Sequence, residues 1–144
     1  REAAQPEFSD YAREVVANAA ELGDALASHG LRLVSGGTDN HLMLVDLRSF
    51  DEELSGKKAR LVLDRAGISL NENTVPDDPR PPYITSGLRI GTPAVTTQGM
   101  GPREMREIAF QIHRVLTHRD DDKVIDATRA ELAELCAKFA PYPT

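Results

Sequence analysis

In four stretches of the chain, apolar residues recur three or four positions apart, the spacing that gathers them on one face of a helix. Ser9 is a candidate N-cap for the first stretch, and Gly30 and Gly67 are placed to end the first and second. The apolar stripe of the last stretch includes Cys136, which we expect in the core. The predicted helices are Ser9–Ser28, Ser55–Ala66, 102–118 and about 123–139.

Shorter runs between these helices have the composition of β-strands. His41–Arg48 has a continuous apolar centre, typical of the most buried strand of a sheet. A Gly-rich turn, Ser35–Asn40, joins it to a run at Leu31–Ser35, so we expect these two strands to pair antiparallel. Further strands are expected at Ile68–Asn71 and Ser86–Gly91. A short, mostly antiparallel sheet packed on long helices defines an α+β domain.

Composition and charge fit this architecture and narrow the function. With 144 residues, 40% hydrophobic and 28% charged, the chain is expected to form one domain, 1–144, with its own core. No apolar run approaches the ~20 residues that span a membrane, and a net charge of −6 with interspersed signs argues against nucleic-acid binding. The single cysteine excludes an internal disulfide and fits a reducing compartment. Because the chain begins at Arg1, we expect a cleaved or excised fragment.

The candidate chemistry lies between Leu70 and Ala94, in LNENTVPDDPRPPYITSGLRIGTPA. Its prolines exclude helix and interior strand from residues 72–85, and so long an irregular connection in a compact domain is usually functional. Arg89 alternates with Leu88 and Ile90 and therefore points to the opposite face of its strand. Its planar guanidinium suits a carboxylate held through two parallel hydrogen bonds. That carboxylate can belong to an Asp or Glu of the same chain or to a ligand.

The same stretch resembles the carboxyl-terminal signature of serine hydroxymethyltransferase (glycine hydroxymethyltransferase). That family has an Asn-x-Asn-x-(Val/Ile)-Pro-x-Asp-Pro segment, followed by Pro-(Phe/Tyr)-x-Thr-Ser-Gly-x-Arg-x-Gly-Thr-Pro-Ala. A second block, Ser35-Gly-Gly-Thr-Asp-Asn-His41 followed by LMLVDL, is also similar to the family. The likeness extends from about Pro6 to Tyr142. The chain therefore resembles the small carboxyl-terminal domain of a fold-type I pyridoxal-phosphate enzyme.

This resemblance implies a substrate site and a folate site. The matching arginine of the family, here Arg89, binds the α-carboxylate of the amino-acid substrate. Many relatives have lysine where this chain has Glu72, which leaves a contact with a folate glutamate tail in doubt, and many have Ser-Pro-Phe in place of the triplet that follows. The resemblance places these residues along the tetrahydrofolate site: Asn73, Pro81, Pro82 and Tyr83.

The resemblance also implies what other parts of the enzyme supply. The family uses pyridoxal 5′-phosphate and tetrahydrofolate, interconverts serine and glycine, and forms cytoplasmic homodimers or larger assemblies. No lysine of this chain lies in anything like the family's cofactor-binding motif. We therefore expect the large cofactor-binding domain to be absent, no catalytic residue here, and a chain that is inactive alone. We expect no metal site, because the adjacent Asp39, Asn40 and His41 cannot converge on one ion.

Two other classes of function stay open. One is a freestanding amino-acid- or folate-binding module without catalysis, and the other is a structural or assembly domain. The nearest enzymatic alternative is a different pyridoxal-phosphate enzyme such as an aminotransferase, against which the Asn-x-Asn loop argues.

Overall fold

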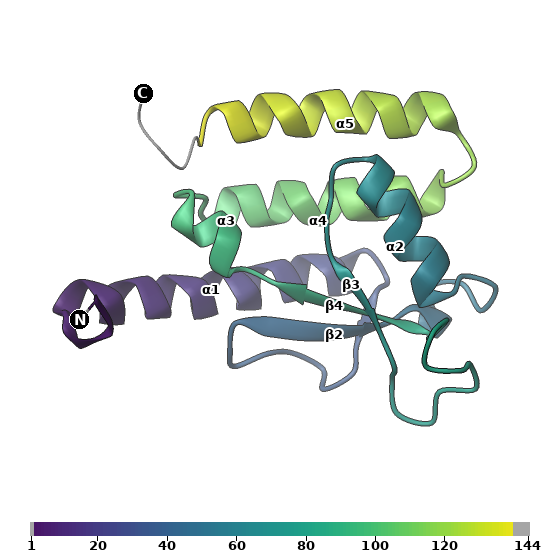
Figure 1. The fold of residues 1–144 in the computed structure, drawn as a ribbon, viewed down its shortest axis with the longest axis horizontal. Coiled ribbons are helices and arrows are strands. Elements are labelled where there is room, and N and C mark those ends of the chain that lie inside the picture. Colours follow the sequence, from purple (N-terminus) through teal and green to yellow (C-terminus); the bar gives the residue numbers. More distant parts are fainter. Residues whose placement is uncertain (1, 140–144) are drawn as a thin grey trace.

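Five α-helices and a four-stranded antiparallel sheet form residues 2–139, the part of the chain that the computed structural model describes (Figure 1). The strands follow the order β1-β2-β4-β3 across the sheet, and each neighbouring pair is antiparallel. The α+β class and the antiparallel pairing of the first two strands are thus confirmed. The elements are α1 Pro6–Ser28, β1 Arg32–Leu33, β2 Leu42–Asp46, α2 Gly56–Arg65, β3 Asn71–Asn73, β4 Gly87–Gly91, α3 Pro93–Thr97, α4 Pro102–Thr117 and α5 Asp122–Ala137, with 3-10 turns at Glu2–Ala4 and Leu47–Ser49.

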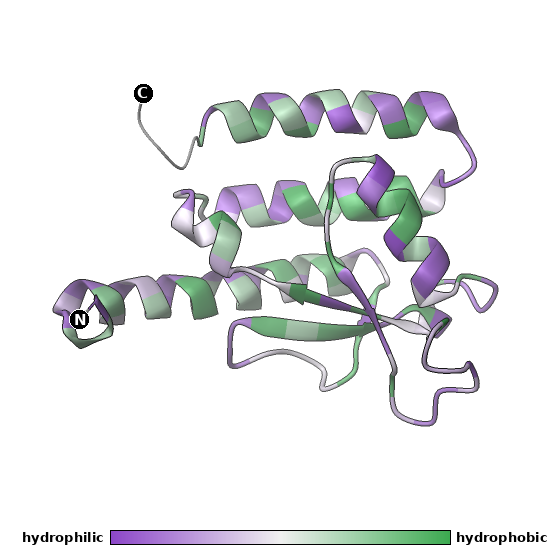
Figure 2. Ribbon diagram, viewed as in Figure 1, coloured by the Kyte–Doolittle hydropathy of each residue, from purple (hydrophilic) through white to green (hydrophobic). Residues whose placement is uncertain are grey.

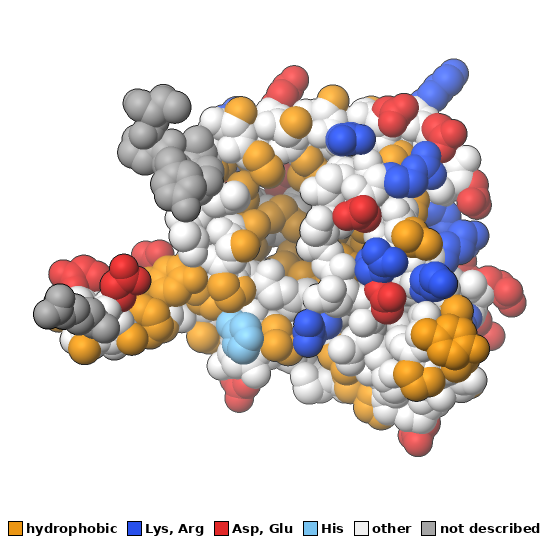
Figure 3. Space-filling view, viewed as in Figure 1, with side chains coloured by type: hydrophobic (Ala, Val, Ile, Leu, Met, Phe, Trp, Pro, Cys, Tyr) orange, Lys and Arg blue, Asp and Glu red, His pale blue; other side chains and the backbone are white. Residues whose placement is uncertain are grey.

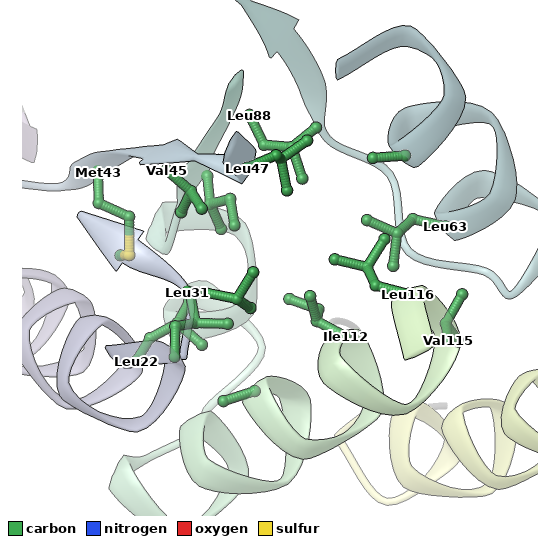
Figure 4. Packing of buried hydrophobic residues seen from close by; sticks show 14 of the residues in the cluster. Leu22, Leu31, Met43, Val45, Leu47, Leu63, Leu88, Ile112, Val115 and Leu116 are labelled. Atoms are coloured by element: carbon green, nitrogen blue, oxygen red, sulfur yellow. The ribbon is translucent and has the colours of Figure 1, made fainter. Parts of the chain in front are cut away.

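The helices α1, α4 and α5 run side by side, with α4 in the middle (Figure 1). The sheet packs against α1, and α2 packs against β3, β4 and α4. Apolar and polar residues alternate along these helices (Figure 2), and buried apolar residues from the helices and the sheet form one core cluster. Burying such surface contributes roughly 25 cal/mol for each Å² removed from water. Figure 4 shows the centre of this core, where side chains from the sheet meet those of three helices: Met43, Val45, Leu88, Leu22, Leu63, Ile112 and Leu116.

Helix boundaries follow the expected stop signals more closely than the expected starts. Gly30 and Gly67 adopt φ of 86° and 87° directly after α1 and α2, a conformation that costs glycine little. Ser55 caps α2 by accepting a hydrogen bond from the Lys58 amide at 3.1 Å. The N-cap prediction at Ser9 is wrong, because α1 begins at Pro6, a residue preorganised for the first helical position.

The third strand lies further along the chain than predicted. The ladder with β4 begins at Asn71 and includes Glu72 and Asn73, which the prolines were expected to exclude from an interior strand. Both residues lie in β3, at the edge of the sheet, where one row of backbone groups needs no partner. The predicted strand residues Ile68 and Leu70 instead pack, half-buried, against the core.

Cys136 is exposed, which contradicts its predicted place in the core. The stripe of α5 does bury Ile125, Thr128 and Leu132. Its last turn, however, lies over a hollow in the surface rather than over packed side chains. Because α5 forms the outer layer, its periodic pattern continues beyond the point where the core ends.

The pH dependence of stability should report on a histidine pair between α1 and α4. The His113 ring stacks on His29 at 4.8 Å, and burial together with the charges of His29 and His118 lowers its pKa below 6.5. The unfolded chain therefore takes up a proton at a higher pH than the folded chain does. The contribution of neutral His113 to the free energy of unfolding should be complete above pH 6.5 and should be lost as the pH falls through the folded pKa of His113.

Urea unfolding at one pH above 6.5 and at one pH below the folded pKa of His113 measures this loss of stability. The variant His113→Gln should lose less stability than the parent on acidification. Equal losses in the two proteins would contradict the assignment to His113.

Candidate functional site

The two faces of β4 differ in chemistry as expected. Leu88 and Ile90 point into the core and are 1% and 7% exposed, whereas Arg89 points outward and is exposed. The alternation follows from the pleat of an extended strand. The arginine therefore lies on the face of the sheet that the helices leave uncovered, called the outer face below.

Register places two asparagines on this outer face. In the β3–β4 ladder Asn71 stands directly opposite Arg89, and Asn73 stands opposite Gly87. Residues opposite each other in a ladder, and residues two positions apart on a strand, share one face. The structure thus brings Asn73 to the same face as Arg89, and it adds Asn71, for which no ligand-binding role was predicted. The side chain of Asn73 donates to the carbonyl oxygen of Thr74 at 2.9 Å, so part of its hydrogen-bonding capacity serves the loop.

Glu72, between the two asparagines, points to the other face. There its carboxylate pairs with Arg60 of α2. Through this ion pair with Arg60, Glu72 joins the edge strand β3 to α2. Its charge is therefore directed away from the outer face.

Arg89 itself makes no ion pair and no side-chain hydrogen bond with any group of residues 2–139. By contrast, Arg48 holds the buried Asp46 at 2.7 Å and Arg119 reaches Asp51. Because Arg89 is exposed, its charge is solvated and needs no partner within this chain. The guanidinium can therefore donate two parallel hydrogen bonds to a carboxylate placed on the outer face.

The loop between β3 and β4 is irregular in conformation but firmly held. At its centre the Asp78 carboxylate accepts hydrogen bonds from the Ser86 hydroxyl at 2.7 Å and from the amides of Ser86, Arg80 and Val75 at 2.8, 3.0 and 3.2 Å. Burial alone would raise the pKa of Asp78, but these hydrogen bonds outweigh it and lower the pKa to about 2. Asp78 therefore organises the whole segment while ionised, a role that no local pattern in the sequence had indicated.

A strained corner closes the same loop. Thr85 is 2% exposed and has a φ of 59°, a left-handed conformation that is a true outlier for a β-branched residue. Such a residue costs of order 1–3 kcal/mol and persists only where its surroundings fix it. Here the first amides of α2 do so, because Gly56 and Lys57 donate to the carbonyls of Thr85 and Ile84 at 3.0 and 2.9 Å.

The corner leaves the predicted folate triplet on the surface. Pro81, Pro82 and Tyr83 are all exposed, and Tyr83 as a whole is 72% exposed. No hydrogen bond within residues 2–139 joins the triplet to Arg89 or Asn73. Figure 1 shows the loop extending beyond the end of the sheet where β3 leaves and β4 begins. The structure thus groups Arg89 with Asn73 and holds the triplet separately, on a loop of fixed shape.

Removal of the Asp78 carboxylate should loosen this loop. We expect Asp78→Ala to lower the free energy of unfolding by about 2 kcal/mol, since it leaves several amides without their acceptor. Because the pKa of Asp78 is lowered from 3.8 to about 2, this contribution is present above pH 3.8 and is lost as the pH falls toward 2. Urea titrations near neutral pH, with Asp126→Ala on the exposed side of α5 as control, measure the difference. Equal midpoints for the two variants would contradict the role of Asp78.

The lysine side chains of this chain are solvent-exposed. A lysine that attaches pyridoxal phosphate is normally desolvated or close to another cationic group, which makes its amine reactive. All lysines of the chain are exposed on α2 or α5 or directly after α5, and none lines the hollow beside Arg89: Lys57, Lys58, Lys123 and Lys138.

Residues 2–139 contain neither a cluster of metal ligands nor a helix suited to a membrane. No group of three or more His, Cys, Asp or Glu side chains in this part is placed to hold a metal ion. None of its helices combines the length and the apolar character needed to cross a membrane.

The fold and the outer face define a small α+β domain that presents an arginine and two asparagines on one open side of its sheet. The sequence profile of the family described as serine hydroxymethyltransferase matches residues 1–112 of the 144. The chain belongs to the serine hydroxymethyltransferase family. The resemblance in the two sequence blocks is thereby confirmed, and the matched range contains β1 to β4, the loop and Arg89.

Proposed function

We propose that this domain acts within a serine hydroxymethyltransferase, which moves the hydroxymethyl carbon of serine to tetrahydrofolate and yields glycine. The observation that carries the proposal is the free guanidinium of Arg89, held on the outer face of a central strand of the sheet. Membership of a transferase family supplies the reaction class. The position of Arg89 supplies a group with which this domain can grip an amino acid.

The role of Arg89 in this proposal is to bind and orient the α-carboxylate. Two parallel N–H···O bonds fix the plane of the carboxylate as well as its position. The neighbouring strands hold the backbone of Arg89 on both sides, through Leu44 and Asn71. An amino acid held in this way presents the bond that must break in one defined direction, and such orientation accounts for a large part of enzymatic rate enhancement.

The folate site in this proposal lies along Asn73 and the loop. A side-chain amide offers both donors and an acceptor, which suits the mixed edge of a pterin ring. The exposed ring of Tyr83, with Pro81 and Pro82 beside it, offers an apolar platform for a flat ligand. Because Asp78 and the strained Thr85 fix the loop, this platform is formed before any ligand arrives. Preorganisation of this kind lowers the entropic cost of binding.

The catalytic group lies elsewhere in this proposal. Pyridoxal 5′-phosphate, bound by another domain of the enzyme, supplies the electron sink for the reaction. This chain contributes binding and orientation, and we propose that the complete enzyme is a cytoplasmic homodimer or a larger assembly. A non-catalytic binding module or an assembly domain is the alternative, and it would be favoured if Arg89→Ala in the full-length enzyme left serine affinity unchanged.

Reductive trapping tests whether the lysine that binds the cofactor belongs to another domain. The purified 144-residue chain is incubated with pyridoxal phosphate and reduced with borohydride, and its intact mass is measured by mass spectrometry. Serine cleavage is assayed in parallel. We expect no stoichiometric adduct and no cleavage of serine. One adduct on a single lysine, or measurable cleavage, would overturn the proposal that the cofactor lysine belongs to another domain.

A further inference from the structure

The outer end of β4 borders a hollow of which the proposed function uses only Arg89. Its volume is about 570 Å³, and it opens on the side of the molecule shown in Figure 3, where hydrophobic side chains line it. Small-molecule pockets in proteins have volumes of about 300–1,000 Å³. The hollow therefore has the size of a ligand pocket.

The hollow exists because the edge strand is short. β3 pairs with β4 only as far as Arg89, and the preceding residues Ile68 and Leu70 diverge from the sheet toward α2. A gap is left between these two residues and Ile90. Residues of α4 and of the last turns of α5 line this gap but do not fill it. Apolar side chains around the gap, such as Val95 and Ile108, are consequently only partly buried.

One charged side chain lines this apolar space. Hydrophobic residues from α1, α3, α4 and α5, from two strands and from the connecting segments make up most of the wall, and the polar side chains lie to one side, on and beside the sheet. Of the lining residues only Arg89 carries a fixed charge, and its guanidinium makes no ion pair within residues 2–139. The lining contains no Asp, Glu or Lys. The complementary ligand is therefore apolar along its length and carries a single negative charge at one end.

A backbone donor stands beside Arg89. The Thr92 amide donates to the carbonyl of His41, the residue directly before β2, at 3.1 Å, and in an antiparallel strand the amides of alternate residues point to opposite neighbours. The amide of Gly91 therefore points away from β2, toward the edge where β3 has already ended. No backbone partner takes it up among residues 2–139. Gly91 also lines the hollow, so its N–H can reinforce the arginine in binding an anion.

We propose that this hollow binds an amphipathic monocarboxylic acid, such as a medium-chain fatty acid, with its tail among the apolar residues and its carboxylate on Arg89 and the Gly91 amide. A preformed apolar pocket with a few polar groups at one end is the usual form of such a site. The proposal stands independently of the catalytic function. If both hold, a bound acid occupies the guanidinium that would otherwise bind the serine carboxylate.

Calorimetric titration of the 144-residue chain with butyrate, hexanoate and octanoate tests the proposal. Each buried CH₂ should tighten binding by about fourfold, so octanoate should bind best. The uncharged 1-octanol should bind at least about tenfold more weakly than octanoate, and Arg89→Gln should weaken octanoate by a similar factor. Equal affinity for octanol and octanoate, or an unchanged affinity in the variant, would overturn the proposal.

Cys136 provides a local readout, because it lines the hollow, is exposed and is the single cysteine of the chain. Octanoate should slow its labelling by a thiol reagent. Cys136→Trp should fill the hollow and abolish octanoate binding. Ala133→Trp, one turn earlier on an exposed position of α5 that does not line the hollow, should bind octanoate as the parent does. Unaltered labelling in saturating octanoate, or full binding by Cys136→Trp, would place the acid elsewhere and overturn the proposal.

Discussion

Replacement of Arg89 by lysine in the full-length enzyme should lower kcat/KM for serine by about 10- to 100-fold. An ammonium group keeps the charge but cannot form the two parallel hydrogen bonds of a guanidinium, and each bond to a charged group contributes about 1.5–3 kcal/mol. The guanidinium makes no ion pair within residues 2–139, so the substitution removes no contact that holds this domain together. The loss should therefore fall on substrate binding and orientation and leave the stability of the domain nearly unchanged.

Steady-state kinetics with serine, combined with thermal unfolding, separates these effects. Arg103→Lys is the matched control, because Arg103 is also exposed and makes no ion pair within the described residues, and it lies on α4 away from the outer face. The control should retain the parent kinetics. If Arg89→Lys stayed within twofold of the parent, a two-pronged grip by Arg89 would be excluded.

The substitution Gly87→Ala should destabilise the domain by about 3 kcal/mol, because the added methyl group has no room between the neighbouring strands. A Cβ at this position would lie 2.4 Å from Cγ1 of Val75 and 2.8 and 2.9 Å from the carbonyl oxygens of Asn73 and Val45. These oxygens belong to the two strands that flank β4, so relief of the clash requires the sheet itself to shift. The added methyl also lies two residues from Arg89 and should disturb the outer face.

Urea unfolding followed by circular dichroism measures this effect. Gly37→Ala is the control, because nothing lies within 4 Å of a Cβ there and its backbone is not left-handed. The control should stay within about 0.5 kcal/mol of the parent. A loss below about 1 kcal/mol for Gly87→Ala would contradict the close approach of Val75 and the neighbouring strands.

Local patterns were sufficient to predict four of the five helices, α1, α2, α4 and α5, and the points at which α1 and α2 end. The spacing of Ala59, Val62, Leu63 and Ala66 gave the buried side of α2, and all four are buried. Stop signals such as Gly30 and Gly67 act through their own backbone conformation, so they are visible in a single sequence. The exposed position of Cys136 was missed because a periodic stripe does not show where its packing partner ends.

The strand boundaries and the support of the site depend on contacts that the periodic pattern of the sequence does not encode. Ile68–Asn71 has a good strand composition, but the ladder forms where β4 can pair with it, at Asn71–Asn73. The ion pair between Glu72 and Arg60 and the four hydrogen bonds to Asp78 join residues that no periodicity relates.

The candidate site was predictable in part. Alternation of apolar and polar residues placed Arg89 on the open face, and the register then brought Asn73 beside it. The hollow next to Arg89 was not predictable, since it arises from a missing neighbour along β4 rather than from any residue pattern.

A comparison of serine with serinamide tests the role of Arg89 most directly. The two ligands differ only in the carboxylate, which is a neutral amide in serinamide. We expect the full-length enzyme to bind serine about 10- to 100-fold more tightly than serinamide, and the ratio to fall close to one in Arg89→Gln. If the variant kept the full preference for serine, the carboxylate would be bound by another group, and the proposed role of this domain would be wrong.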